Sequence, residues 1–148
     1  MNKINGKRII IFIISAFAIM NISWFLITTV KYDKFIKDLP KVEGSSYGMK
    51  KEDGYNYSVK KPGYLHYTGN LAVSNSKKGE LLIIWPLISG GYEYGVRIEE
   101  DGEAYEIYVD GNMKPIDKND TYAVQNIEQH RAGVEKLFSK ANKMWQLK

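Results

Sequence analysis

The 148-residue sequence contains no cysteine, and this absence removes several kinds of chemistry at once. Disulfides, thiolate metal sites, cysteine nucleophiles and a lipid-modified N-terminal cysteine are all excluded. Histidine is nearly absent, since only His66 and His130 occur, and the chain has no P-loop, nucleophile elbow or zinc-protease motif. The sequence therefore predicts no catalytic residue, no metal ligand and no cofactor-binding residue.

Acidic residues are missing before Asp33, and residues 9–30 carry no charge of either sign. Three basic residues, Lys3, Lys7 and Arg8, precede this apolar stretch, whereas residues 31–148 hold 18 basic and 17 acidic side chains. The net charge of +4 thus mostly reflects the flank of an apolar segment, and no nucleic-acid partner is predicted. The excess of Lys over Arg, with frequent Ile and Asn, is typical of an AT-rich, bacterial genome.

The apolar stretch Ile9–Val30 has the length of a transmembrane helix. At about 1.5 Å per residue it covers roughly 33 Å, and a bilayer's hydrocarbon layer is about 30 Å thick. A cleaved secretory signal is the alternative, but its apolar region is usually about 7–15 residues long and ends in small residues. Because this segment ends in Thr28, Thr29 and Val30, we expect an uncleaved signal-anchor in contact with lipid.

Basic residues flank both ends of the apolar stretch and do not decide its orientation. The short, acid-free N-terminal flank favours an N-terminus in the cytoplasm and a C-terminal domain outside it, in a single-pass protein of the cell membrane. The expected organisation is a cytoplasmic flank at 1–8, a transmembrane helix at 9–30, a juxtamembrane helix and linker at 31–54, and an extracytoplasmic domain at 55–148.

The dipeptide Asp101-Gly102 lies between two alternating segments, which is a strong β-hairpin signal. A two-residue turn there sets Val96 opposite Ile107 on the core side and Arg97 opposite Glu106 on the reverse side. Three opposed pairs are predicted to face the core: Ile98 with Tyr105, Val96 with Ile107, and Tyr94 with Val109.

Residues 81–88 form an apolar run that predicts a central strand, although Pro86 requires a bulge, a bend or an edge position. If Ser89-Gly90-Gly91 turns this strand into the hairpin, Ile84 opposes Val96, and Trp85 lies across from Gly95 and shields it.

Apolar residues recur at three- and four-residue spacing from Thr121 to about Leu147, which predicts one long helix capped by Asn119 or Asp120. Gly133 is expected to bend this helix slightly. The predicted fold class is α+β, with an N-terminal transmembrane helix followed by an antiparallel β-meander of four to six strands that the C-terminal helix packs against.

The hairpin register gathers aromatic and charged side chains on the face opposite the predicted core. These candidate binding residues are Ile83, Trp85, Arg97, Glu106 and Tyr108. Aromatic side chains and Arg are frequent anchors of protein interfaces. Either this face is open and binds a partner, or the N-terminal strands of the domain cover it.

Two classes of function are compatible with this sequence. The first is a non-enzymatic, membrane-anchored interaction module that binds another membrane or envelope protein, or a cell-wall component. The alternative is a secreted or envelope enzyme whose site forms only in the fold, with His66, His130 and nearby acids as its best candidates. The sequence favours the first class.

Overall fold

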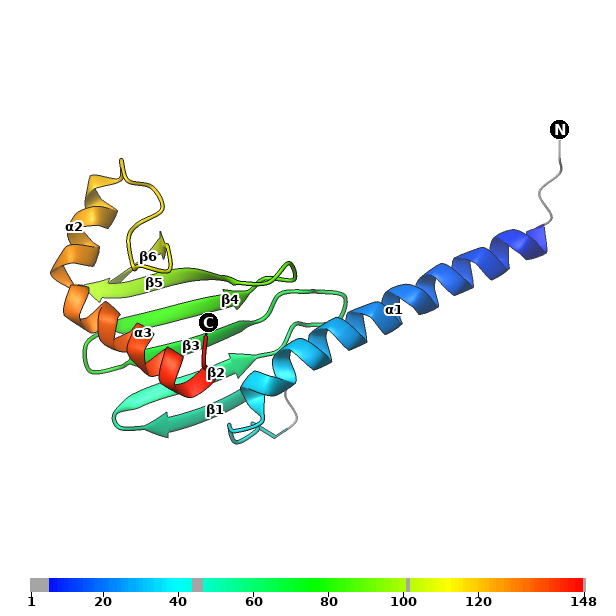
Figure 1. Ribbon diagram of the computed structural model, residues 1–148, viewed down its shortest axis with the longest axis horizontal. Coiled ribbons are helices and arrows are strands. Elements are labelled where there is room, and N and C mark those ends of the chain that lie inside the picture. Colours follow the sequence, from blue (N-terminus) through cyan, green and yellow to red (C-terminus); the bar gives the residue numbers. More distant parts are fainter. Residues whose placement is uncertain (1–5, 44–46, 101, 148) are drawn as a thin grey trace.

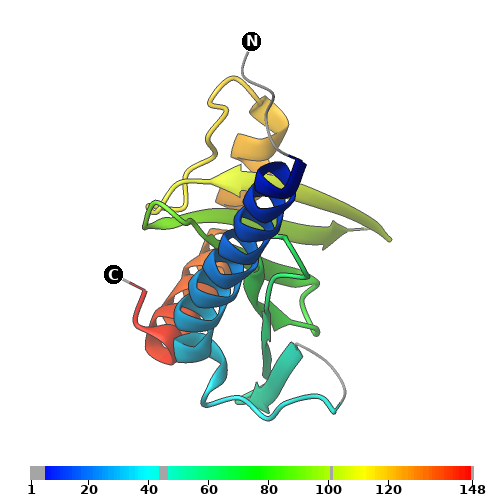
Figure 2. The ribbon, with the colours of Figure 1, turned by 90° about the vertical axis from the view of Figure 1, so that its right-hand side faces the viewer.

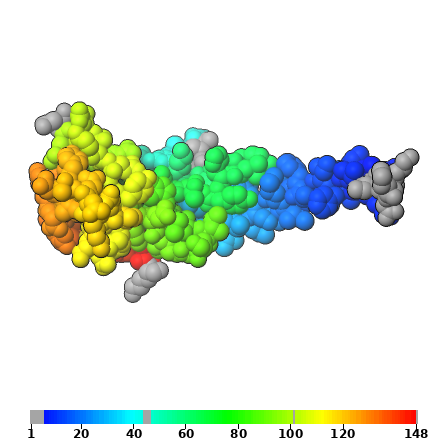
Figure 3. Space-filling view, turned by 90° about the horizontal axis from the view of Figure 1, so that it is seen from above, coloured from blue at the N-terminus to red at the C-terminus, as the bar shows by residue number. Residues whose placement is uncertain are grey.

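The computed structural model describes residues 6–43, 47–100 and 102–147, and it contains a six-stranded antiparallel sheet with helices on one face. A long rod-like helix leaves the domain at one end (Figures 1 and 3). In chain order the elements are α1 Gly6–Ile36, β1 Tyr47–Glu52, β2 Tyr55–Lys60, β3 Asn70–Asn75, β4 Glu80–Pro86, β5 Tyr92–Glu100, β6 Glu103–Val109, α2 Thr121–Gln129 and α3 Arg131–Trp145.

The sheet is a simple meander in which each strand pairs with the next one along the chain, in the order β1 to β6. Alternation along the strands directs one set of side chains to the helices, as in β2, where Tyr55, Tyr57 and Val59 are buried. The helices α1 and α3 lie on the same side of the sheet (Figure 2). The predicted α+β fold class, with an antiparallel β-meander against which C-terminal helical structure packs, is confirmed.

The β5–β6 hairpin has the predicted register. Val96 pairs with Ile107, Arg97 pairs with Glu106, and Glu100 pairs with Glu103 at the end of the ladder. Gly102 has φ +82°, as a turn of this kind requires, while Asp101 lies outside the described residues. The alternation predicted from the sequence therefore sets the core side of the sheet correctly.

The predicted register between β4 and β5 is wrong by two positions. Ile84 pairs with Tyr94 instead of Val96, and Trp85 pairs with Glu93 instead of Gly95. The reason is that β4 stops at Pro86, and residues 87–91 then form a loop in which the amide of Leu87 donates to Gly91 O. A shift of two residues keeps every side chain on its predicted face.

The C-terminal helical region is broken at His130, which separates α2 from α3 and has φ −97° and ψ 10°. The single long helix with a slight bend at Gly133 is thus corrected to two helices. Asp120 caps α2, since its carboxylate accepts a hydrogen bond of 2.9 Å from the amide of Ala123. The buried face of α3 includes Val134, Leu137 and Ala141.

Helix α1 is continuous with the core of the domain. Its last turns bury Tyr32, Phe35 and Ile36, and the indole N–H of Trp145 in α3 donates to Phe35 O at 3.2 Å. Residues 31–54 are therefore not only helix and linker, because they supply core side chains and the edge strand β1. By length and composition, α1 is consistent with a membrane anchor or a signal sequence.

Candidate binding face

The face of the sheet opposite the helices carries all five side chains that the sequence singled out. Trp85 is half-buried and Tyr108 is 53% exposed, whereas Ile83 is only 7% exposed and offers little surface to a partner. No described helix or strand lies over these side chains, so the alternative in which the N-terminal strands cover this face is not what the fold shows. Strands β1, β2 and β3 instead extend the sheet edgewise.

Trp85 and Tyr108 form a stacked pair on this face, with ring centroids 5.7 Å apart and ring planes at 24°. The indole also lies over Gly95, where an added Cβ would come within 2.8 Å of Trp85 Cη2. The predicted shielding of Gly95 therefore occurs diagonally across the ladder instead of from the directly opposed position. Together these contacts hold a flat aromatic surface at the edge of the open face.

Arg97 and Glu106 are cross-strand partners beside this aromatic pair. The guanidinium Nη2 donates to Glu106 Oε2 at 2.7 Å, and the side chains of Arg97 and Glu106 are 47% and 29% exposed. A pair this exposed contributes at most about 1 kcal/mol to stability, because water screens both charges. Separating the two charged groups would therefore cost little energy.

A shallow groove of about 540 Å³ continues the face toward β1. Arg97 stands at one side of it and Met49, which is 49% exposed, at the other. The middle strands line it with small or polar side chains, including Ser58 and Ala72. Sequence reasoning missed the contribution of Met49 because it placed this residue in a linker, and no periodic signal marks the short strand β1.

The two histidines differ sharply in their surroundings. His66 is exposed, in the β2–β3 loop. His130 lies between two carboxylates, with Nδ1 3.4 Å from Glu80 Oε1 and Nε2 2.9 Å from Glu100 Oε1. Because the sheet brings Glu80 to His130 from 50 residues away, sequence spacing gave no sign of this cluster.

A general acid or base needs a ring nitrogen that can reach the substrate. Both nitrogens of His130 already face carboxylates, and Glu80 is 5% exposed. A cavity of about 310 Å³ adjoins this cluster, but the imidazole presents no unpartnered nitrogen to it. The arrangement is that of a structural contact, in which His130, at the break between α2 and α3, interacts with Glu80 of β4 and Glu100 of β5.

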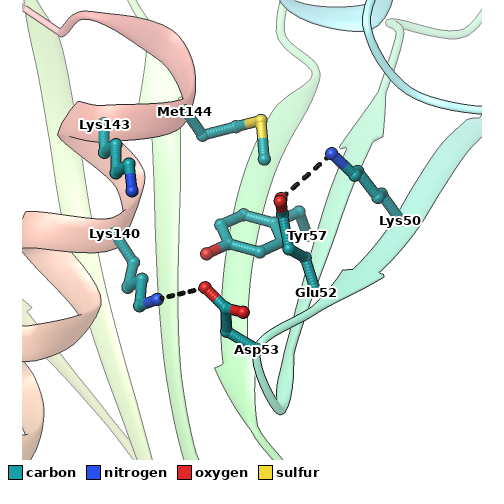
Figure 4. Close-up of a pocket in the computed structure, with 7 residues that line it drawn as sticks. All are labelled: Lys50, Glu52, Asp53, Tyr57, Lys140, Lys143 and Met144. Atoms are coloured by element: carbon teal, nitrogen blue, oxygen red, sulfur yellow. Dashed lines mark hydrogen bonds and ion pairs between the residues drawn. The ribbon is translucent and has the colours of Figure 1, made fainter.

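A second cavity, of about 220 Å³, lies between the β1–β2 turn and α3 (Figure 4). Lys140 Nζ lies 3.2 Å from Asp53 Oδ2 there, and this hydrogen bond raises the pKa of Lys140. Burial raises the pKa of the neighbouring Tyr57 hydroxyl. A nucleophilic lysine or a basic tyrosine requires the opposite shift, so this cavity holds no activated group.

Within the part of the chain that the structure describes, no group of three His, Asp or Glu residues is arranged to hold a metal ion. The open sheet face, which carries the stacked Trp85 and Tyr108 beside the Arg97–Glu106 pair, is the strongest candidate site. Neither a protein-family model, nor a curated protein sequence, nor a solved structure matches this chain.

Proposed function

We propose that this chain is a single-pass protein of the bacterial cell membrane whose extracytoplasmic domain is a non-enzymatic binding module for another membrane or envelope protein. Helix α1 is the anchor, with its N-terminus in the cytoplasm. The observation that carries the proposal is the stack of Trp85 on Tyr108 beside the exposed Arg97–Glu106 pair.

Several features support a protein partner for this face. Aromatic and Arg side chains dominate the energetics of protein interfaces, and Tyr108 is exposed enough to enter a pocket of a partner. The neighbouring groove adds contact area. Its small polar side chains can form hydrogen bonds with polar groups of a partner. A cell-wall glycan is the competing ligand, since it too stacks on aromatic rings.

The enzyme alternative receives less support from the same structure. His130 has a carboxylate on each ring nitrogen, and Lys140 is held as an ammonium by Asp53. Neither group is poised for proton transfer or nucleophilic attack in the described part of the chain.

The anchor is tested by fractionation of intact cells. The full-length protein should stay with membranes after an alkaline carbonate wash and should retain its N-terminal sequence. Protease added outside the cell should digest the domain. A released species beginning near Lys31 would instead identify residues 1–30 as a cleaved signal.

The binding face is tested with a photoreactive amino acid placed at Tyr108, and at Lys136 as a control on the exposed side of α3. The Tyr108 position should give a discrete protein adduct in intact cells, and the Lys136 position should not. Arg97→Ala should weaken the adduct with little change in thermal stability. Equal adducts from both positions contradict the proposal, and an adduct removed by cell-wall hydrolase points to the glycan.

A further inference from the structure

The β2–β3 loop, residues 61–69, runs back along α1 toward its apolar half. The indole N–H of Trp24 donates to His66 O at 2.8 Å, and the Tyr64 hydroxyl donates to the side-chain oxygen of Asn21. The rings of Trp24 and Tyr64 pack edge to face, with centroids 5.3 Å apart. The tip of this loop is therefore level with Asn21 and Trp24 of α1.

This level lies inside the stretch that sequence alone assigns to the membrane. Asn21 is nine residues before Val30, which corresponds to about 14 Å along a helix axis. If the hydrocarbon layer extends to Val30, the loop tip lies within it. If the layer ends at Trp24, where an interfacial aromatic is expected, the tip lies in the headgroup layer. The loop meets lipid wherever the boundary falls between these two residues.

The exposed side chains at this end of the domain have the character that the interface favours. Tyr64 is 58% exposed and Leu65 is 37% exposed. Leu65 has φ +59°, an unfavourable conformation for a residue with a Cβ. Ile88, which is 56% exposed, lies in the β4–β5 loop, and this loop is joined to the same side of the molecule by the bond from Lys31 Nζ to Leu87 O.

Basic side chains surround a cavity immediately behind the loop tip. It measures about 380 Å³, and its lining includes Lys60, Lys61 and His66 but no acidic residue of the described chain. Lys61 is paired with Asp33 of α1, and Lys60 is exposed. In a lipid monolayer the phosphates lie next to the acyl chains. The basic cavity and the neighbouring loop tip have the same order, because the cavity would lie at the phosphates and the tip at the acyl chains.

We propose that the β2–β3 loop is a second membrane contact, which inserts Tyr64 and Leu65 into the bilayer that α1 crosses and sets Lys60 against the phosphates of anionic lipids. This inference rests on the proposed anchor. It makes the domain lie against the membrane surface instead of standing clear of it on a flexible stalk.

The absence of native cysteine allows single spin labels to be placed in the full-length protein, reconstituted into vesicles of phosphatidylcholine with or without phosphatidylglycerol. Labels at Ile13→Cys, Leu65→Cys and Lys77→Cys report the helix, the loop tip and the opposite end of the sheet. Accessibility to oxygen should exceed accessibility to a polar nickel complex at Ile13 and Leu65, and the order should reverse at Lys77. Tyr64→Cys is a second reporter at the loop tip, should Leu65→Cys disturb the loop.

The outcomes separate the two proposals. If the Ile13 label is open to the nickel complex, the anchor itself is wrong. If the Ile13 label is in lipid while the labels at Leu65 and Tyr64 resemble that at Lys77, the anchor stands and the loop insertion is overturned. The Leu65 label should lie deeper in vesicles with phosphatidylglycerol than in vesicles without it. Lys60→Gln should remove this difference in depth between the two lipid compositions. An equal depth in both lipids overturns the role of Lys60.

Discussion

Gly133 lies so close to Glu80 that a methyl group on Gly133 would come within 2.1 Å of Glu80 Oε1. The carboxylate occupies the space beside the first turn of α3, where the positive end of the helix dipole favours a negative group. His130 approaches the same oxygen from the helix break. Gly133, which has no side chain, thus leaves the space that Glu80 of β4 occupies beside α3.

Gly133→Ala should therefore destabilise the domain, although the same change stabilises most helices by about 1 kcal/mol. Displacing a buried carboxylate should lower the free energy of unfolding by about 1–3 kcal/mol. Chemical denaturation measures this change. In a Glu80→Ala background the space is free, so Gly133→Ala should become neutral or stabilising there. Equal destabilisation in both backgrounds would contradict the proposed contact.

His130→Ala should destabilise the domain by about 1–3 kcal/mol, because it removes a hydrogen-bond partner from the buried carboxylate of Glu80. Glu128→Ala is the matched control, since this exposed residue pairs only with Arg131 in the described chain. Thermal unfolding of the two variants compares them directly. A similar melting temperature for both would mean that the His130 cluster contributes nothing to stability.

Gly102→Val should weaken the β5–β6 hairpin, because a β-branched residue is poorly tolerated at φ +82°. The loss should be about 1–3 kcal/mol in free energy of unfolding. Gly102→Asn should cost much less, since Asn adopts this conformation more readily, and substitution of the exposed Glu103 should matter little. Amide hydrogen exchange of Val96 and Ile107 reports the hairpin itself.

Asp110 introduces a pH dependence at the end of β6. Its Oδ1 accepts hydrogen bonds from the amides of Asn112 and Lys114, and the bond from Lys114 is the main reason that its pKa is lowered. A lowered pKa in the folded state means that this stabilisation is present above the pKa of the unfolded chain, near 4, and is lost as the pH falls through the lower folded value.

The stability difference between the natural protein and Asp110→Ala should accordingly be present at pH 7, at about 1 kcal/mol, and should shrink at pH 3. Denaturation at the two pH values measures it. Asp117→Ala, which removes a carboxylate that accepts from the backbone amide of Asn119, is the control. A difference that is constant with pH would show that the turn does not depend on the charge of Asp110.

Trp145→Phe should loosen the junction between α1 and α3. It removes the donor to Phe35 O while keeping an aromatic ring against Tyr57. The expected loss is about 1 kcal/mol, with faster hydrogen exchange in the last turn of α1. Unchanged exchange there would show that packing alone holds the junction.

Local signals predicted the fold where neighbours in sequence are neighbours in space. The alternation around Asp101-Gly102 determined both faces of the hairpin, and with them the position of Arg97 beside Glu106. The approach of Glu80 to Gly133 spans 53 residues, and no local periodicity encodes it. The β4–β5 register failed because Pro86 ended its strand earlier than the glycines at 90 and 91 suggested.

The binding face was likewise only partly predictable. Trp85 and Tyr108 follow from the hairpin register, but the contribution of Met49 depends on the edge strand β1, which contains Gly48 and two lysines. Such residues are common on edge strands and weak as strand signals, so their pairing with β2 is evident only from the assembled sheet.

Helix α1 runs unbroken from its apolar half into the core, and this continuity fixes the rotational orientation of the domain around the helix axis. A helix turns by about 100° per residue, so one alanine inserted before Asn21 would rotate the whole sheet by that angle relative to the N-terminal turns. A partner bound to the N-terminal turns of α1 would then face a different side of the domain. An insertion close to one full helical turn, which is about 3.6 residues, would nearly restore the original orientation of the sheet.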